Sequence, residues 1–180
     1  MVPPSWLPDD IRAAGFVPDL RSAMADLASV GARQPGTALI YDMDHTEGTY
    51  AAAERLHALF ERVVIATPRD TIAQDTPLVT RQGILRRMYQ KHIDIIVLGE
   101  PRWSEQFEDG RLEIVNVYNG DSRVIDNLAF LAYSTPRAPA LDLYQPLVEA
   151  GLTPQVIGDC RNARNVLAAT SEGHAAGNAV

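Results

Sequence analysis

Hydrophobic runs and amphipathic stretches alternate through the first half of the chain. Residues 38–41, 63–66 and 93–98 are apolar runs of the kind that form buried strands. Residues 49–60 and 78–90 lie between these runs and are predicted to be helices. Strands and helices that alternate at this spacing form βαβ units, so the pattern predicts a parallel sheet with helices packed on it.

Shorter alternating segments follow in the second half. Two turn signals, Glu108-Asp109-Gly110 and Asn119-Gly120-Asp121, separate three predicted strands at residues 103–107, 111–118 and 122–125. Such short turns join neighbouring antiparallel strands. We therefore expect a small β-meander in this part of the chain.

The last third of the chain is predicted to contain two strands, each followed by a helix. Residues 127–133 are predicted to return as a strand, and residues 141–150 form an amphipathic helix that Gly151 ends. Val156 and Ile157 then precede Gly158 and Asp159, and a final helix follows. The pattern at this end predicts a strand, a tight turn and a helix.

Composition and charge exclude several classes of function. The chain has 180 residues, 46% of them hydrophobic, which is enough for one domain with a buried core. A formal net charge of −7 argues against nucleic acid and anionic membranes as partners, because both are bound through Lys and Arg. No apolar run approaches the roughly 20 residues that span a bilayer, so we expect a cytoplasmic protein.

Candidate metal ligands are few and scattered. Cys160 is the only cysteine, so the chain can hold neither an internal disulfide nor an iron–sulfur cluster, which takes about four thiolates. The four histidines are too dispersed to form a ligand set. We expect no metal site in this chain.

The loop after the first predicted strand is acidic. A dinucleotide-binding turn needs several glycines so that backbone amides can approach the pyrophosphate. Here the loop carries Asp42, Asp44 and Glu47, and its one glycine is Gly48. The carboxylates would repel a diphosphate, so we expect a solvated loop that caps the next helix through Thr46 or Thr49.

The same loop has a second interpretation. Residues 39–46 resemble the first motif of haloacid-dehalogenase-type phosphohydrolases, in which an Asp-x-Asp-x-Thr pattern ends a strand. This resemblance implies a Mg²⁺-dependent phosphohydrolase with Asp42 as nucleophile and Asp44 as general acid/base. The later acidic motif is incomplete, because Ala163 replaces the second acid that should follow Gly158 and Asp159.

The Gly-Asp turn carries the favoured interpretation. From about residue 37 to residue 180, the order of elements and of short motifs resembles the C-terminal region of the trimethylamine dehydrogenase and 2,4-dienoyl-CoA reductase flavoprotein family. The motifs include Arg86-Arg87-Met88, Ile157-Gly158-Asp159-Cys160, and Arg164 with Gly173 and His174. In that family an FMN-binding barrel with an iron–sulfur cluster precedes an FAD- or ADP-binding domain, which a smaller NAD-like domain interrupts.

The resemblance implies an α/β fold with three regions. Residues 37–133 would form a Rossmann-like three-layer domain with a parallel sheet and an antiparallel β-meander. Residues 134–180 would be a return segment whose strand and helix complete an FAD/ADP-binding half-domain. Residues 1–36, with a helical stretch at 19–30, would be a lead-in arm that packs on a partner or on that half-domain.

The resemblance also implies a site and a partner. The cofactor-binding residues would be Gly158, Asp159, Arg164, Asn165 and Val166, with the carboxylate of Asp159 on nucleotide hydroxyls and the helix N-terminus beside them. The simpler alternative is that Asp159 only caps the helix. No catalytic residue is expected in this chain, because the barrel and the cluster cysteines are absent from its 180 residues. FMN and a 4Fe–4S cluster are expected only in a larger flavoprotein partner, which would share FAD or ADP with this subunit and oxidise a substrate such as an N-methylated amine.

Trp6 and Trp103 are the only tryptophans. Indole side chains are favoured at protein interfaces, so both are candidate interface anchors, with a place in the core as the alternative.

Overall fold

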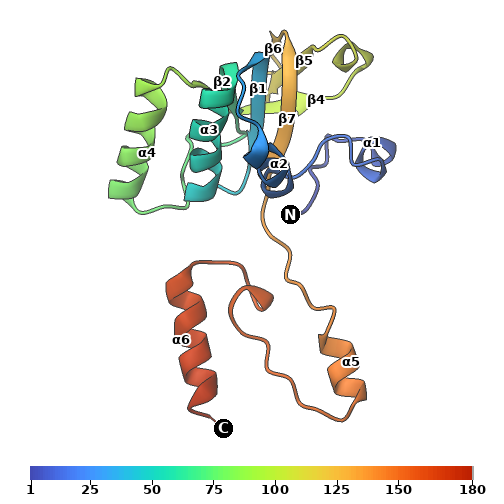
Figure 1. Cartoon of the computed structure of the whole chain (residues 1–180), viewed down its shortest axis with the longest axis vertical. Coiled ribbons are helices and arrows are strands. Elements are labelled where there is room, and N and C mark those ends of the chain that lie inside the picture. Colours follow the sequence, from blue (N-terminus) through green and yellow to red (C-terminus); the bar gives the residue numbers. More distant parts are fainter. Residues whose placement is uncertain (180) are drawn as a thin grey trace. The chain divides into compact units, whose positions relative to one another are not determined.

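The computed structural model describes residues 1–179, which form two compact units. Unit 1 contains Met1 and residues 3–135, and unit 2 contains Val2 and the described residues from Pro136 onward. Figure 1 shows the elements of both units along the chain.

A four-stranded parallel sheet forms the centre of unit 1. Its strands are β1 (Gln34–Asp42), β2 (Phe60–Ala66), β3 (Asp94–Ile96) and β7 (Leu128–Ser134), in the order β3-β2-β1-β7. Helix α3 (Glu47–Leu59) joins β1 to β2, and α4 (Leu78–Gln90) lies between β2 and β3. The predicted α/β class and parallel sheet are confirmed.

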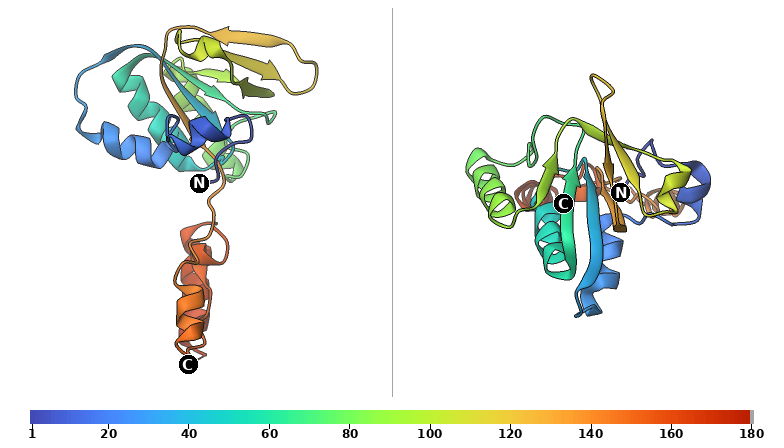
Figure 2. Two further views of the ribbon diagram at one scale, coloured as in Figure 1. Left: turned by 90° about the vertical axis from the view of Figure 1, so that its right-hand side faces the viewer. Right: turned by 90° about the horizontal axis from the view of Figure 1, so that it is seen from above.

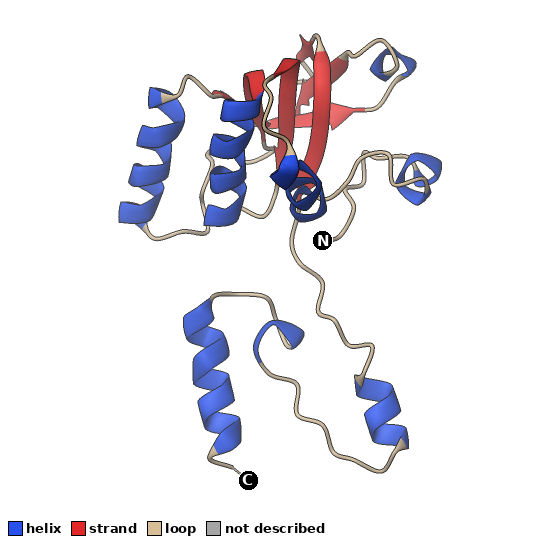
Figure 3. Cartoon of the chain, in the orientation of Figure 1, coloured by secondary structure: helices blue, strands red, loops and turns tan. Residues whose placement is uncertain are grey.

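Two layers cover this sheet. The faces alternate along β1, so that Ile40 packs with the helices in one apolar cluster and Leu39 packs with the meander in another. The meander consists of β4 (Gly99–Arg102), β5 (Leu112–Asn116) and β6 (Ser122–Ile125), paired antiparallel in that order. Figures 2 and 3 show helices on one side of the parallel sheet and the meander on the other, which is the three-layer arrangement.

The first strand of the meander differs from the prediction. Residues 103–107 are not a strand; β4 comes earlier, and Glu105–Phe107 is a 3₁₀ helix, η2. Leu98 has a φ of 55°, so the chain turns sharply after β3 and β4 starts at once. Gly99 permits this turn to pack closely, because a Cβ there would lie 2.6 Å from the Ile114 side chain.

The N-terminal residues, apart from Val2, belong to unit 1. Here α1 (Asp9–Ala13), α2 (Leu20–Asp26) and the 3₁₀ helix η1 (Leu27–Ser29) precede β1, so the helical stretch predicted at 19–30 is two short pieces. The apolar clusters on the two faces of the sheet include buried side chains from this segment. Leu20 and Ala23 lie in one cluster, and Leu7 and Val17 lie in the other. The segment expected to be a lead-in arm therefore buries apolar side chains within unit 1.

Unit 2 has helices but no core. It contains α5 (Tyr144–Glu149), the 3₁₀ helix η3 (Gly158–Cys160) and α6 (Val166–Gly177). None of residues 136–179 is buried, and Leu143, Val166 and Leu167 are 74–79% exposed. Ile157 is extended, with φ −133° and ψ 163°, but residues 156–157 join no sheet. The strand predicted there is not formed, because an extended segment becomes a strand only beside a hydrogen-bonded neighbour.

Across residues 1–179, no helix combines the length and the apolar character that crossing a bilayer requires.

Candidate functional site

Asp42 ends β1 as a fully buried carboxylate. Its Oδ1 accepts a hydrogen bond from the backbone N–H of His45 at 3.0 Å, and its Oδ2 accepts one from the Tyr50 hydroxyl at 2.7 Å. The Tyr50 oxygen in turn accepts a hydrogen bond from the backbone N–H of Ala73. One carboxylate thus ties the end of β1 to α3 and, through Tyr50, to the loop that follows β2.

His45 fills the space beside this carboxylate. Its side chain is fully buried, with Nε2 3.3 Å from Thr67 Oγ1 and Nδ1 3.8 Å from Asp42 Oδ2. Its backbone is left-handed, with a φ of 52°, which is uncommon for a residue other than glycine. Folding the loop inward in this way turns the imidazole towards the end of β2.

Burial sets the protonation of the cluster. Desolvation raises the pKa of Asp42, although His45 and the Tyr50 hydrogen bond act in the opposite direction. Desolvation also lowers the pKa of His45, and this effect outweighs the attraction of Asp42. The pKa of Tyr50 is raised, first by burial and then by the neighbouring Asp42 carboxylate. The imidazole of His45 is therefore neutral at pH 7.

The prediction of a solvated loop is thus wrong for Asp42 and His45, although Glu47 and Gly48 are exposed, and the predicted side-chain cap is not formed. Asp42 and His45 are fully buried, Thr46 is the N-cap of α3 but makes no side-chain capping bond, and the Thr49 hydroxyl bonds Ser134. The loop folds inward because a buried carboxylate needs hydrogen-bond donors, and the His45 amide and the Tyr50 hydroxyl supply them.

The geometry also excludes Asp42 as a nucleophile. A carboxylate that attacks phosphorus must reach the substrate, but Asp42 has no exposed surface and both of its oxygens are engaged. Asp44 accepts a hydrogen bond from the Thr46 hydroxyl at 2.6 Å. No group of three or more His, Cys, Asp or Glu within residues 1–179 is arranged to hold a metal ion.

The Gly-Asp turn lies in unit 2, in η3. Gly158 has a φ of 59°, a conformation that favours glycine, and its N–H donates to Glu172 Oε2 at 2.7 Å. Asp159 Oδ2 accepts from the Arg137 guanidinium at 3.1 Å, and the Asp159 side chain is 58% exposed. The turn is thus organised while its carboxylate stays accessible.

The start of α6 completes this arrangement. Asn165 caps the helix by accepting from the Ala168 N–H at 2.9 Å, which shows that Asp159 is not the cap. Arg137 also donates to the Arg164 carbonyl at 3.2 Å, and the Arg164 side chain donates to Glu172. Of the five residues predicted as the cofactor site, Gly158, Asp159 and Arg164 therefore lie in one network of polar contacts, and Asn165 and Val166 begin the helix beside it.

Arg137 and Glu172 hold that network and were not predicted. Arg137 is 22 residues from Asp159 and 27 from Arg164, and Glu172 is 14 residues from Gly158. No short sequence motif links residues at such separations. The Arg164 hydrogen bond, followed by the Gly158 amide, lowers the pKa of the Glu172 carboxyl, which keeps it charged at neutral pH.

The fold and these contacts define a Rossmann-like α/β protein with an accessory turn-and-helix unit. No protein-family model matches the chain, and no curated protein sequence matches it either. Solved structures do match. Histamine dehydrogenase from Rhizobium sp. 4-9 is 19% identical with a TM-score of 0.74, over 88% of this chain and 25% of that one.

Two further solved structures have similar scores. The 6-hydroxypseudooxynicotine amine oxidase HisD from Pseudomonas geniculata N1 is 19% identical with a TM-score of 0.72, over 85% of this chain and 23% of that one. A 2-naphthoyl-CoA reductase is 15% identical with a TM-score of 0.73, over 96% of this chain and 24% of that one. The chain spans about a quarter of the length of these oxidoreductases, and at such identities the likeness establishes the fold. A match over 96% of the chain cannot be confined to unit 1, so it includes unit 2.

Proposed function

We propose that this chain is a small, non-catalytic subunit of a heteromeric flavin-dependent oxidoreductase that resembles trimethylamine dehydrogenase. In this proposal a larger partner chain carries FMN and a 4Fe–4S cluster and oxidises the substrate, an N-methylated amine or a related small compound. This chain completes an FAD or ADP site through Gly158, Asp159 and the start of α6. The named activities of the similar structures, an amine dehydrogenase and an amine oxidase among them, support the class of substrate.

The main support for this proposal is the exposure of the residues of unit 2. Unit 2 matches part of longer oxidoreductase chains, yet none of its residues from 136 to 179 is buried. A segment with so much exposed apolar surface gains little from folding by itself. A second polypeptide that covers this surface would supply the missing packing.

The residues of the turn suit an adenine nucleotide. The Asp159 carboxylate is accessible and can accept from ribose or ribityl hydroxyls. The amides of Val166 and Leu167, in the first turn of the 12-residue helix α6, make no hydrogen bond within the described residues. Free amides at a helix N-terminus favour an anionic group such as a phosphate. When bound, FAD would supply electron transfer, whereas this chain only binds and orients its nucleotide half.

Replacing Asp159 by Ala tests the proposal in the purified complex. We expect the visible flavin absorbance per complex, or the bound ADP after acid extraction, to fall about tenfold, because the hydroxyl contacts are lost. Asp142→Ala is the matched control, since Asp142 is an exposed aspartate of unit 2 outside the network. Full nucleotide occupancy in the Asp159 variant would contradict the proposal.

A further inference from the structure

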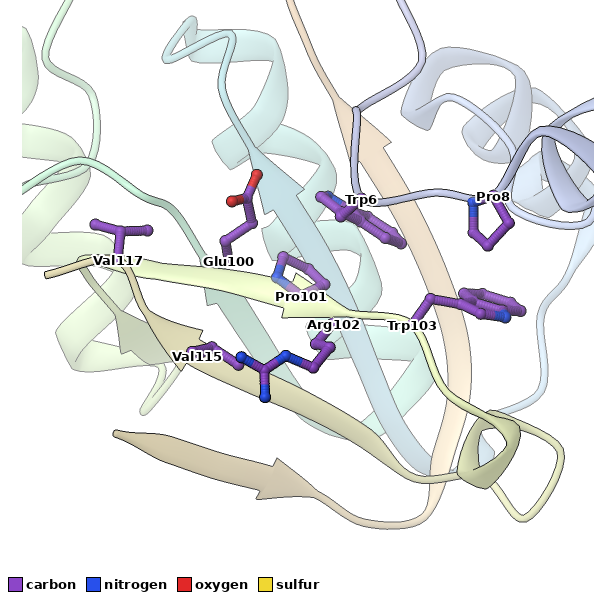
Figure 4. Close-up of a pocket in the computed structure, with 8 residues that line it drawn as sticks. All are labelled: Trp6, Pro8, Glu100, Pro101, Arg102, Trp103, Val115 and Val117. Atoms are coloured by element: carbon purple, nitrogen blue, oxygen red, sulfur yellow. The ribbon is translucent and has the colours of Figure 1, made fainter. Parts of the chain in front are cut away.

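A pocket lies beside the edge strand of the meander, in unit 1. It has a volume of about 430 Å³ and is lined by Trp6, Pro8, Glu100, Pro101, Arg102, Trp103, Val115 and Val117. Pockets of about 300–1,000 Å³ hold small molecules. Figure 4 shows the Trp6 indole and the Glu100 carboxylate on the same side of β4, with Trp103 at the end of that strand.

The charge around this pocket favours a cation. Glu100 Oε1 accepts from the Tyr41 hydroxyl at 3.1 Å, and a neutral donor leaves the carboxylate charge in place. Burial, followed by the charge of Glu100, raises the pKa of Tyr41, so its hydroxyl keeps its proton. Arg102 is balanced by Glu113 at 3.4 Å, and its guanidinium points away from Trp6 in Figure 4. Among the two charged residues that line the pocket, Glu100 is the one without an ion pair within residues 1–179.

The two indoles are held in place by other aromatic rings. Trp6 stands edge-on to Tyr41, with the ring centroids 5.6 Å apart and the planes at 89°. Trp103 packs against Phe107 in a tilted arrangement, with centroids 4.2 Å apart and planes at 33°. Both rings are therefore set in position before a ligand arrives, which lowers the entropy cost of binding.

We propose that this pocket binds a small organic cation with a methylated ammonium group. Indole faces attract cations within about 6 Å of the ring centroid, and a nearby carboxylate adds to this attraction. A methylated ammonium suits such a site, because it presents apolar methyl groups to the rings and needs few hydrogen-bond acceptors. The proposal involves unit 1 alone, so it does not depend on the flavin site.

The tryptophans themselves report binding, because the chain has no others. Choline is titrated into the full-length chain at constant ionic strength while indole emission is recorded. The uncharged isostere 3,3-dimethyl-1-butanol is titrated in parallel. We expect a saturable change with choline and at least about fivefold weaker binding of the neutral alcohol.

Variants separate a built site from a weak surface effect. Glu100→Gln should weaken choline binding about fivefold, whereas Glu105→Gln, an exposed carboxylate of η2 outside the pocket, should leave it unchanged. In Trp6→Phe and Trp103→Phe, the remaining tryptophan should still respond to choline. Circular dichroism confirms that each variant is folded.

Several results would overturn the proposal. They are a linear change without saturation, equal responses to choline and the neutral alcohol, or equal effects of the Glu100 and Glu105 substitutions. A response to phosphatidylcholine vesicles but not to free choline would also contradict it, since the ligand would then be a lipid headgroup.

Discussion

At the scale of single residues, Asp42 shows how the carboxyl edge of the sheet is closed. In a dinucleotide-binding domain this edge is where the glycine-rich turn meets the phosphates. Here Asp42, His45 and Tyr50 are buried at the edge and are bonded to one another or to backbone. At this edge, the chain's own side chains fill the place that a glycine-rich turn and phosphates take in a dinucleotide-binding domain.

Removing the Asp42 carboxylate should be costly. Asp42→Ala leaves the Tyr50 hydroxyl and the His45 amide without their acceptor in a buried place, so we expect the free energy of unfolding to fall by about 3 kcal/mol. Asp44→Ala removes a less buried carboxylate from the same loop and should cost about 1 kcal/mol or less. Urea denaturation at neutral pH measures both, and equal losses would refute the assigned role of Asp42.

The stability contributed by His45 should depend on pH. Burial lowers its folded-state pKa below the usual 6.5, so the unfolded chain takes up the proton first as the pH falls. The contribution of His45 is therefore complete above pH 6.5 and is lost as the pH falls towards the folded-state pKa. His45→Asn is a suitable reference, because asparagine accepts the left-handed backbone. The difference in free energy of unfolding between the two proteins should shrink between about pH 7.5 and pH 5.5, and a constant difference would contradict the assignment.

At the scale of elements, the start of β1 is fixed by a close approach to β7. Gly36 has a φ of 93°, and a Cβ there would lie 2.7 Å from the Asn127 carbonyl oxygen and 2.9 Å from Ala129 Cβ. The next residue, Thr37, donates its N–H to the same Asn127 carbonyl at 2.7 Å. Only glycine allows the two strands to meet in this way.

Gly36→Ala should therefore weaken the pairing of β1 with β7. We expect a loss of about 2 kcal/mol or more in the free energy of unfolding, from the steric clash and the strained φ together. Gly31→Ala serves as the control, since a Cβ at Gly31 meets nothing within 4 Å, and it should change stability by about 0.5 kcal/mol or less. Thermal or urea unfolding measures the free energy of unfolding of both variants, and equal losses would contradict the role given to Gly36.

The elements that sequence predicted well are those with a local signal. Helix α4 was predicted with its observed bounds, and β6 likewise, because periodicity and turn residues act over short distances. The shift of β4 depended on the left-handed Leu98, and the bond from Ala73 to Tyr50 spans 23 residues. Contacts between residues so far apart produce no repeating pattern in the sequence, so the burial of Asp42 could not be predicted. Within the candidate site, sequence named the turn and helix but not Arg137, which links them.

At the scale of the whole molecule, the two units differ in what stabilises them. Unit 1 has apolar clusters on both faces of its sheet, whereas the described part of unit 2 has no buried side chain and is organised by polar contacts. Apolar burial is the main source of folding free energy. The stability of the isolated chain should therefore reside in unit 1.

Truncation after Thr135 tests this division. We expect residues 1–135 to unfold cooperatively at the same urea concentration as the main transition of the full chain. Limited trypsin digestion of the full chain should cleave first within unit 2, after Arg161 or Arg164, where the backbone is exposed. A marked loss of stability on truncation would show that unit 2 contributes to the fold of unit 1.

Isolation of this chain from its native host tests whether it works as part of a flavoprotein complex. The chain is purified through an affinity tag under mild conditions, its partners are identified by mass, and the absorbance spectrum is recorded. We expect a larger partner in a constant ratio, together with the visible absorbance of bound flavin. A folded, colourless chain that purifies without any partner would contradict it.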